Sequence, residues 1–247
     1  MKIDTVILSS NDNPDYIQFW PIVSEAWKLM GVNPILIYTG EKKLKLKGDV
    51  INFNIKNIDS SFVAQNIRIL YPSLLTNKTC LVSDIDNLPL SRNYFLDSIS
   101  SFNKNSFIIY RPDACPPNMI SMMWNAAAAE TWYELFKVDS EKKIEKYLNK
   151  WYTKNYSIQG KAWYTDQIKL RKHVNKFSRK NKSRIIELDD DELGFYRFNR
   201  NRLEKHLAIM NENPYVRFTD FHMPRPLSEY EELINKVFEH HKRYIIS

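Results

Sequence analysis

The chain has 247 residues, 43% of them hydrophobic and 26% charged, so it is long enough to bury the core of one α/β domain or of two small ones. Its two cysteines, Cys80 and Cys115, exclude a disulfide framework and a four-cysteine zinc site, and they suit a reducing, cytoplasmic compartment. The formal net charge of +7 favours an anionic partner, such as a nucleotide diphosphate, a polyanion or an anionic surface, without choosing among them.

The first third of the sequence alternates predicted strands and a helix. Apolar and β-branched residues predict a buried strand over 3–9 and two further strands over 33–38 and 49–54. The helix between the first two strands starts after the N-cap Asn13 and stops at Gly31, with apolar residues at helical spacing. This order predicts parallel strands joined by right-handed crossovers. The N-terminus does not read as a signal peptide, and no apolar run reaches the roughly 18 residues of a membrane span.

Two closely spaced carboxylates follow the next predicted strand. A mostly apolar helix over 62–75 carries Arg68, which would be costly to bury without a partner and is expected to pair with Asp84 or a diphosphate, or to form a structural salt bridge. The apolar strand that begins at Thr79 then runs into Asp84 and Asp86. Because strand side chains repeat every two residues, these carboxylates should start on one face, where they repel each other unless a cation lies beside them. A divalent metal site is therefore predicted, and two solvated aspartates in a turn are the alternative.

The rest of the chain is predicted to continue the α/β pattern. Strands are expected over 106–111, 185–188 and 194–198. Helices are expected from Ala126, over 144–151, from Trp163 with Thr165 or Asp166 near its N-terminus, and after a capping box at Ser228 and Glu231. The basic run 168–184 has eight Lys or Arg and no acid, and it is interpreted as a solvated helix face. No repeat or flexible linker divides the chain, so one domain over 1–247 is expected.

The order of several short motifs resembles that in nucleotide-sugar-dependent glycosyltransferases of the GT-A fold. The motifs are the polar loop Ser9-Ser10-Asn11-Asp12-Asn13, the helix residue Arg68, the D-x-D motif Asp84-Ile85-Asp86, the pair Asp166-Gln167, and His222 within 221–226. The Asp166-Gln167 pair is similar to one found in retaining, GT8-like members of that fold.

This resemblance implies a single α/β domain of GT-A (Rossmann-like) architecture, with a central, mostly parallel sheet flanked by helices. Residues 1–111 would bind the nucleotide sugar, and 112–247 would form the acceptor and catalytic half. The implied activity transfers a sugar from a nucleotide diphosphate donor, with a UDP-sugar favoured by family habit, to a glycan or another hydroxyl acceptor. Mn²⁺ or Mg²⁺ is the implied cofactor, and a retaining outcome is favoured.

The resemblance also implies roles for individual residues. Donor binding is expected of Ser9, Ser10, Asn11, Asp12, Arg68, Asp84 and Ile85. Metal binding is expected of Asp86 as the firmer ligand, of Asp84, which could serve the ribose instead, and of His222.

Catalysis is expected of Asp166 and Gln167. Asp166 keeps three interpretations: a helix cap, a base in an inverting reaction, or a group that binds sugar hydroxyls or stabilises an oxocarbenium-like state in a retaining one. Acceptor contacts are expected from the aromatic and amide side chains of Trp124, Asn125, Trp163 and Tyr164. For each of the three aromatic rings, core packing is the alternative. The remaining histidines are expected at the surface: His173, His206, His240 and His241.

Two other function classes compete with this one. The first is a Mg²⁺-dependent nucleotidyl- or phosphoryl-transfer enzyme that uses Asp84 and Asp86 for the metal, although the chain has only 5 glycines and no P-loop. The second is a basic nucleic-acid-binding protein, which would need its positive charge gathered on one face. A Rossmann dehydrogenase is disfavoured because G-x-G-x-x-G is absent after the first strand. No nucleic-acid partner is expected.

Overall fold

A computed structural model describes residues 1–213 and 215–246. Its centre is a seven-stranded sheet in the order β3-β2-β1-β4-β7-β6-β8. The strands are β1 (Thr5–Ser10), β2 (Asn33–Tyr38), β3 (Asp49–Asn52), β4 (Thr79–Ser83), β6 (Phe107–Tyr110), β7 (Trp124–Ala128) and β8 (Ile185–Leu188). Strand β7 runs antiparallel to β4 and β6, and the other neighbouring pairs are parallel. The predicted mixed α/β architecture with a mostly parallel sheet is confirmed.

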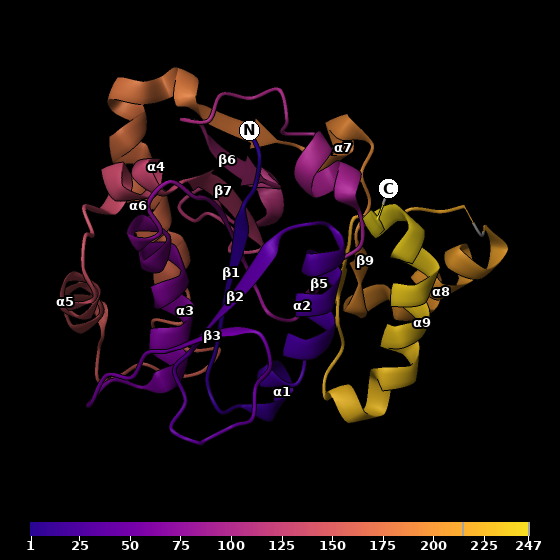
Figure 1. The fold of residues 1–247 in the computed structure, drawn as a ribbon, viewed down its shortest axis with the longest axis horizontal. Coiled ribbons are helices and arrows are strands. Elements are labelled where there is room, and N and C mark those ends of the chain that lie inside the picture. The colour runs from indigo at the N-terminus through magenta and orange to yellow at the C-terminus, as the bar shows by residue number, and fades with distance from the viewer. Residues whose placement is uncertain (214, 247) are drawn as a thin grey trace.

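Helices cover both faces of this sheet (Figure 1). They are α1 (Pro14–Ile17), α2 (Trp20–Leu29), α3 (Ser60–Leu70), α4 (Ala129–Phe136), α5 (Glu141–Trp151), α6 (Thr165–Asn181), α7 (Asp190–Leu193), α8 (Leu203–Glu212) and α9 (Leu227–Ile246). Alternate residues of one strand enter different cores. Val6 and Leu8 of β1 join the core formed with α2 and α9, whereas Ile7 joins the core formed with α3 to α6. Burial on both faces explains why the strands read as continuous apolar runs.

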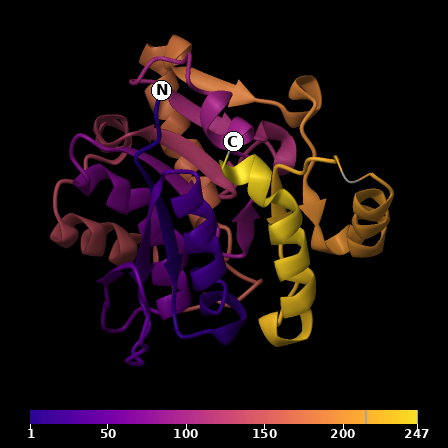
Figure 2. The ribbon, with the colours of Figure 1, turned by 45° about the vertical axis from the view of Figure 1, so that its right-hand side comes forward.

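A second, three-stranded sheet lies beside α9, which runs alongside α2 (Figure 2). Its central strand β10 (Asp220–His222) pairs antiparallel with β5 (Asn87–Pro89) and parallel with β9 (Phe198–Asn199). In this register His222 stands opposite both Asn87 and Asn199. The small sheet therefore brings the turn after β4 next to a segment more than a hundred residues later in the chain.

Most element types follow the sequence, but several boundaries differ from prediction. The helix expected from Ala126 begins at Ala129, because β7 pairs with strands on both sides and this pairing outweighs the helix propensity of alanine. The strand expected over 194–198 is mostly wrong, since α7 ends at Gly194 with φ +69° and β9 starts only at Phe198. The final helix starts before Ser228, so the predicted capping box is not formed.

The histidine prediction is also wrong in part, because His206 and His241 are buried. None of the helices in the described part of the chain combines the length and apolar character that crossing a membrane requires.

Candidate active site

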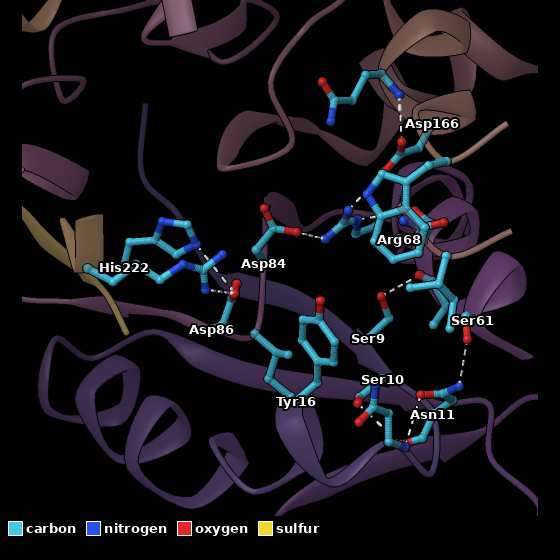
Figure 3. Close-up of a pocket in the computed structure, with 18 residues that line it drawn as sticks. Ser9, Ser10, Asn11, Tyr16, Ser61, Arg68, Asp84, Asp86, Asp166 and His222 are labelled. Atoms are coloured by element: carbon cyan, nitrogen blue, oxygen red, sulfur yellow. Dashed lines mark hydrogen bonds and ion pairs between the residues drawn. The ribbon is translucent and has the colours of Figure 1, made fainter. Parts of the chain in front are cut away.

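A cavity of about 210 Å³ opens at the carboxyl ends of β1 and β4. Strand β1 has β2 on one side and β4 on the other, so the strand order changes direction here. Crevices at such switch points are the usual ligand sites of open α/β sheets. The cavity is lined by side chains from three helices, α1, α3 and α6, and from two strands, β1 and β10 (Figure 3). The turn after β4 and the segment that follows β9 also contribute to the lining.

The polar loop after β1 forms one wall of the cavity. The side chains of Ser9 and Ser10, at the end of β1, and of Asn11, in the loop after it, line the cavity, and their role in donor binding stays a prediction. Asn11 Nδ2 donates hydrogen bonds of 3.0 Å to the hydroxyls of Ser60 and Ser61 at the start of α3. The loop is therefore fastened to the helix that carries Arg68.

Asp12 has a different place from the one predicted. It does not line the cavity, and its carboxylate accepts backbone N–H bonds from Glu41 at 2.8 Å and Lys42 at 3.1 Å, together with the Tyr38 hydroxyl. Asp12 thus holds the loop after β2.

Arg68 joins two carboxylates at the back of the cavity. Its Nη1 pairs with Asp84 and its Nη2 donates to Asp166 Oδ2 at 2.8 Å. Burial alone would lower the pKa of Arg68, but the charges of Asp84 and Asp166 raise it above its usual value, so Arg68 is a fixed cation. Burial raises the pKa of Asp166, against the opposing effect of Arg68. The predicted pairing of Arg68 with Asp84 is confirmed, and its pairing with Asp166 is an addition.

Asp86 faces a second group of basic side chains. Its Oδ2 lies 3.0 Å from Arg200 Nη1 and 3.4 Å from His222 Nε2. Burial alone would raise the pKa of the Asp86 carboxyl, but hydrogen bonding to His222 and the charges of Arg200 and Arg225 hold it well below its usual range. Arg200 was not expected at this site, because its place depends on the pairing of β9 with β10, which the sequence did not predict.

The carboxylates of the D-x-D motif do not share one strand face. Strand β4 ends at Ser83, and Asp84 to Asp86 form a turn before β5, so that Asp84 points toward Arg68 and Asp86 toward His222 (Figure 3). Within residues 1–213 and 215–246, no group of three or more His, Cys, Asp or Glu is arranged to hold a metal ion. Two of the three predicted ligands, Asp86 and His222, nevertheless adjoin each other.

These donors fit a metal ion that takes most of its ligands from elsewhere. Mg²⁺ and Mn²⁺ accept one or two carboxylates or an imidazole, and water and substrate phosphates complete the shell. Asp84 also lines the cavity, and its side chain is 33% exposed, so it is a third donor, and the second carboxylate, within the same cavity.

The start of α6 forms the opposite wall. Gln167 and Trp163 line the cavity with Asp166. Tyr164 is the N-cap of α6, so the helix expected from Trp163 begins at Thr165, one of the two residues predicted near its N-terminus. Tyr164 is exposed and does not line the cavity.

The other two residues predicted to contact an acceptor lie away from the cavity. Trp124 and Asn125 are fully buried in β7 and do not line the cavity, so the expectation of acceptor contacts is wrong for this pair. Trp124 packs against the guanidinium groups of Arg111 and Arg197, and Asn125 Nδ2 donates to Ser121 O at 2.8 Å. Core packing, the alternative interpretation, is what the structure has.

A buried ionic cluster supports the small sheet from behind. Asp220, two residues before His222 on β10, is fully buried and lies 2.8 Å from both Arg111 Nη2 and Arg197 Nε. Arg197 also bonds to Asn87, the residue after Asp86. The cluster therefore fixes the strand that carries His222 against the turn that carries Asp86.

Comparison with known proteins supports the architecture. No family model matches the sequence, and no curated protein sequence matches it. Among solved structures, an active-site mutant of LgtC aligns with a TM-score of 0.50 and 9% identity over 94% of this chain and 95% of that one. The chain has the GT-A fold. The predicted fold class is thereby confirmed.

Other structures with the GT-A fold align at lower TM-scores. A glycosyltransferase involved in glycosylation of the major capsid of PBCV-1 aligns with a TM-score of 0.47 and 13% identity over 94% of this chain and 99% of that one. The glycosyltransferase GlyE of Streptococcus pneumoniae TIGR4 aligns with a TM-score of 0.48 and 13% identity over 100% of this chain and 62% of that one.

Proposed function

We propose that this protein is a metal-dependent, retaining glycosyltransferase that moves a sugar from a nucleotide diphosphate donor, most favourably a UDP-sugar, to a hydroxyl group of a glycan acceptor. One observation carries the proposal. Residues distant in the sequence, namely Arg68, Asp84, Asp86, Asp166 and His222, meet in one cavity at the switch point of a GT-A fold. A site for a metal ion and a diphosphate requires carboxylate, imidazole and guanidinium groups close together in this way.

The charges that line the cavity support metal dependence. Three aspartates and two arginines contribute a net negative charge when His222 is neutral. A diphosphate that entered alone would be repelled by Asp84 and Asp86, so a divalent cation must accompany it. When bound, such an ion supplies Lewis-acid stabilisation of the leaving diphosphate. We assign this ion, Mn²⁺ or Mg²⁺, to Asp86 and His222, with Asp84 as a further ligand.

The residues that line the cavity support one orientation of the donor. Ser9, Ser10 and Asn11 offer polar groups for the nucleoside at one end, and Ile85 lies beside the diphosphate region between the two aspartates. We therefore assign donor binding mainly to residues 1–111. The acceptor side is assigned to 112–247, where Trp163 at the cavity wall and the exposed Tyr164 offer rings for a sugar.

Asp166 and Gln167 are assigned to the reacting sugar. Both oxygens of Asp166 are engaged, one by Arg68 and the other by the backbone N–H of Gln167 at 2.8 Å, and the side chain is almost completely buried. A carboxylate held in this way suits a fixed negative charge near an oxocarbenium-like centre better than a base that must take up an acceptor proton. This favours retention of configuration, with the side chain of Gln167 in contact with the sugar.

We also propose that the protein works in the cytoplasm. Both Cys80 and Cys115 are free thiols in the structure, and such thiols stay reduced in that compartment.

The direct test is a screen of nucleotide sugars for Mn²⁺-dependent hydrolysis, because glycosyltransferases commonly transfer some donor to water when no acceptor is present. Cleavage of one donor, with loss of activity on chelation and in Asp86→Ala, is the expected result. The anomer released first, observed by NMR, reports retention or inversion. Thermal stabilisation by oligonucleotides, with none by UDP and Mn²⁺, would contradict the proposal.

A further inference from the structure

Arg200 is held at the cavity by a single nitrogen. It begins the 3₁₀ turn Arg200–Arg202, directly after β9. Its Nη1 donates to Asp86 Oδ2 at 3.0 Å and to the Met223 carbonyl at 3.2 Å. Among the described residues, its Nη2 and Nε have no hydrogen-bonding partner, although Arg200 lines the cavity. The N–H groups of Nη2 and Nε can therefore donate hydrogen bonds to a ligand in the cavity.

The acceptors that hold Arg200 are rigid, whereas Arg200 itself is accessible. The backbone N–H of Met223 donates to the Asp86 carbonyl at 2.9 Å, which locks these two residues together. The side chain of Asp86 is only 9% exposed, whereas that of Arg200 is 23% exposed. When the ion pair between Arg200 and Asp86 is broken, Arg200 is therefore the residue that moves, since its solvated guanidinium can turn while Asp86 stays in place.

Asp86 can bind a metal ion while Arg200 stays beside it only if another anion lies nearby. In the free protein Arg200 compensates the buried Asp86 charge, which would be costly alone. A divalent ion on the same oxygen would stand a few ångströms from the guanidinium and repel it. A diphosphate brings negative charge to this point, and its oxygens suit the planar fork of an arginine.

We propose that Arg200 binds the diphosphate of the donor, and that it occupies Asp86 in place of the metal ion until donor and metal arrive together. This inference rests on the proposed function and adds to it a residue that touches the leaving group. It makes metal and donor binding mutually dependent, because each supplies the charge that the other needs.

The test measures metal and nucleotide binding separately in Arg200→Gln. Mn²⁺ alone, titrated by the EPR signal of the free ion, should bind up to about fivefold more tightly, because the competing ion pair with Asp86 is gone. UDP and inorganic pyrophosphate, titrated by calorimetry in Mn²⁺, should bind roughly 10- to 100-fold more weakly, because charged hydrogen bonds to phosphate are lost. Arg200→Lys keeps the charge without the fork and should fall between Gln and the wild type.

Arg202→Gln is the matched control, because Arg202 lies on the same 3₁₀ turn but lines a separate cavity with Lys205. Both of its affinities should equal those of the wild type. A purely structural role of Arg200 predicts that both affinities fall in parallel with the thermal stability, and that result, or no change in either affinity, overturns the inference. A wild-type protein that binds neither UDP nor pyrophosphate in Mn²⁺ overturns the proposed function itself and this inference with it.

Discussion

Arg68 and Asp166 are 98 residues apart in the sequence, yet Arg68 Nη2 donates to Asp166 Oδ2 at 2.8 Å inside the protein. The contact joins α3, which lines the cavity, to the first turn of α6. Because Arg68 also pairs with Asp84, one guanidinium sets the positions of a residue assigned to the donor and of a residue assigned to the sugar. The positions of Asp84 and Asp166 therefore both depend on this buried cation.

Asp166→Asn is expected to lower turnover much more than donor binding. The amide keeps the shape of the side chain but removes the negative charge proposed to stabilise the reacting sugar, which should reduce kcat roughly 100- to 1,000-fold. Steady-state kinetics with the donor identified by the screen, together with UDP titrations in Mn²⁺, would separate the two effects. Unchanged kcat would remove Asp166 from the catalytic residues.

His222→Ala is expected to raise the Mn²⁺ concentration required for half-maximal activity by roughly tenfold. The imidazole nitrogen adjoins Asp86, so its loss removes one protein donor while the carboxylate remains. Activity should recover when Mn²⁺ is raised to saturation. A metal titration identical to that of the wild type would return His222 to a structural role.

Asp220→Asn is expected to destabilise the fold by about 3–5 kcal/mol, because it leaves two buried arginines without their shared counterion. Urea denaturation followed by circular dichroism gives the free energy of unfolding. The matched control is Asp139→Asn, whose partner Lys143 is exposed and whose ion pair should contribute little to stability because solvent screens it. Equal stability of the two variants would contradict a supporting role for the buried cluster.

Stability should fall as the pH drops from about 6.5 toward 4, because of His241. Burial lowers the pKa of His241 from 6.5 to about 4, and its Nε2 accepts a hydrogen bond of 3.1 Å from the Phe218 backbone N–H, which requires the neutral ring. Between these values the unfolded chain binds the proton and the folded protein does not, so lowering the pH favours unfolding by up to roughly 3 kcal/mol. Urea denaturation across this range would measure the slope, which should be smaller in His241→Gln.

The parts of the site that follow local patterns could be predicted from the sequence. The apolar strands at the N-terminus and before Asp84 have a clear pattern, and parallel pairing places their carboxyl ends together. Arg68 stood out because a lone charge in an apolar helix requires a partner, and Asp84 is that partner.

The parts that depend on long-range pairing could not be predicted in the same way. Strands β5, β9 and β10 have only 3, 2 and 3 residues, too few for a recognisable alternation, and without them neither Arg200 nor its distance from Asp86 follows from the sequence. The burial of His241 could not be predicted either, because charged residues flank it in the sequence.

The three-stranded sheet has a further consequence for how this protein could be recombined with others. Its strands come from both sides of position 111, with β5 before it and β9 and β10 after it. A chimaera that kept 1–111 and took its remaining residues from another protein of this fold would lose the backbone partners of Asn87 unless the graft supplied matching strands. Residues 1–111 and 112–247 are therefore not interchangeable modules, and the proposed acceptor side is better tested by exchanging the loop before α6 than by exchanging either segment whole.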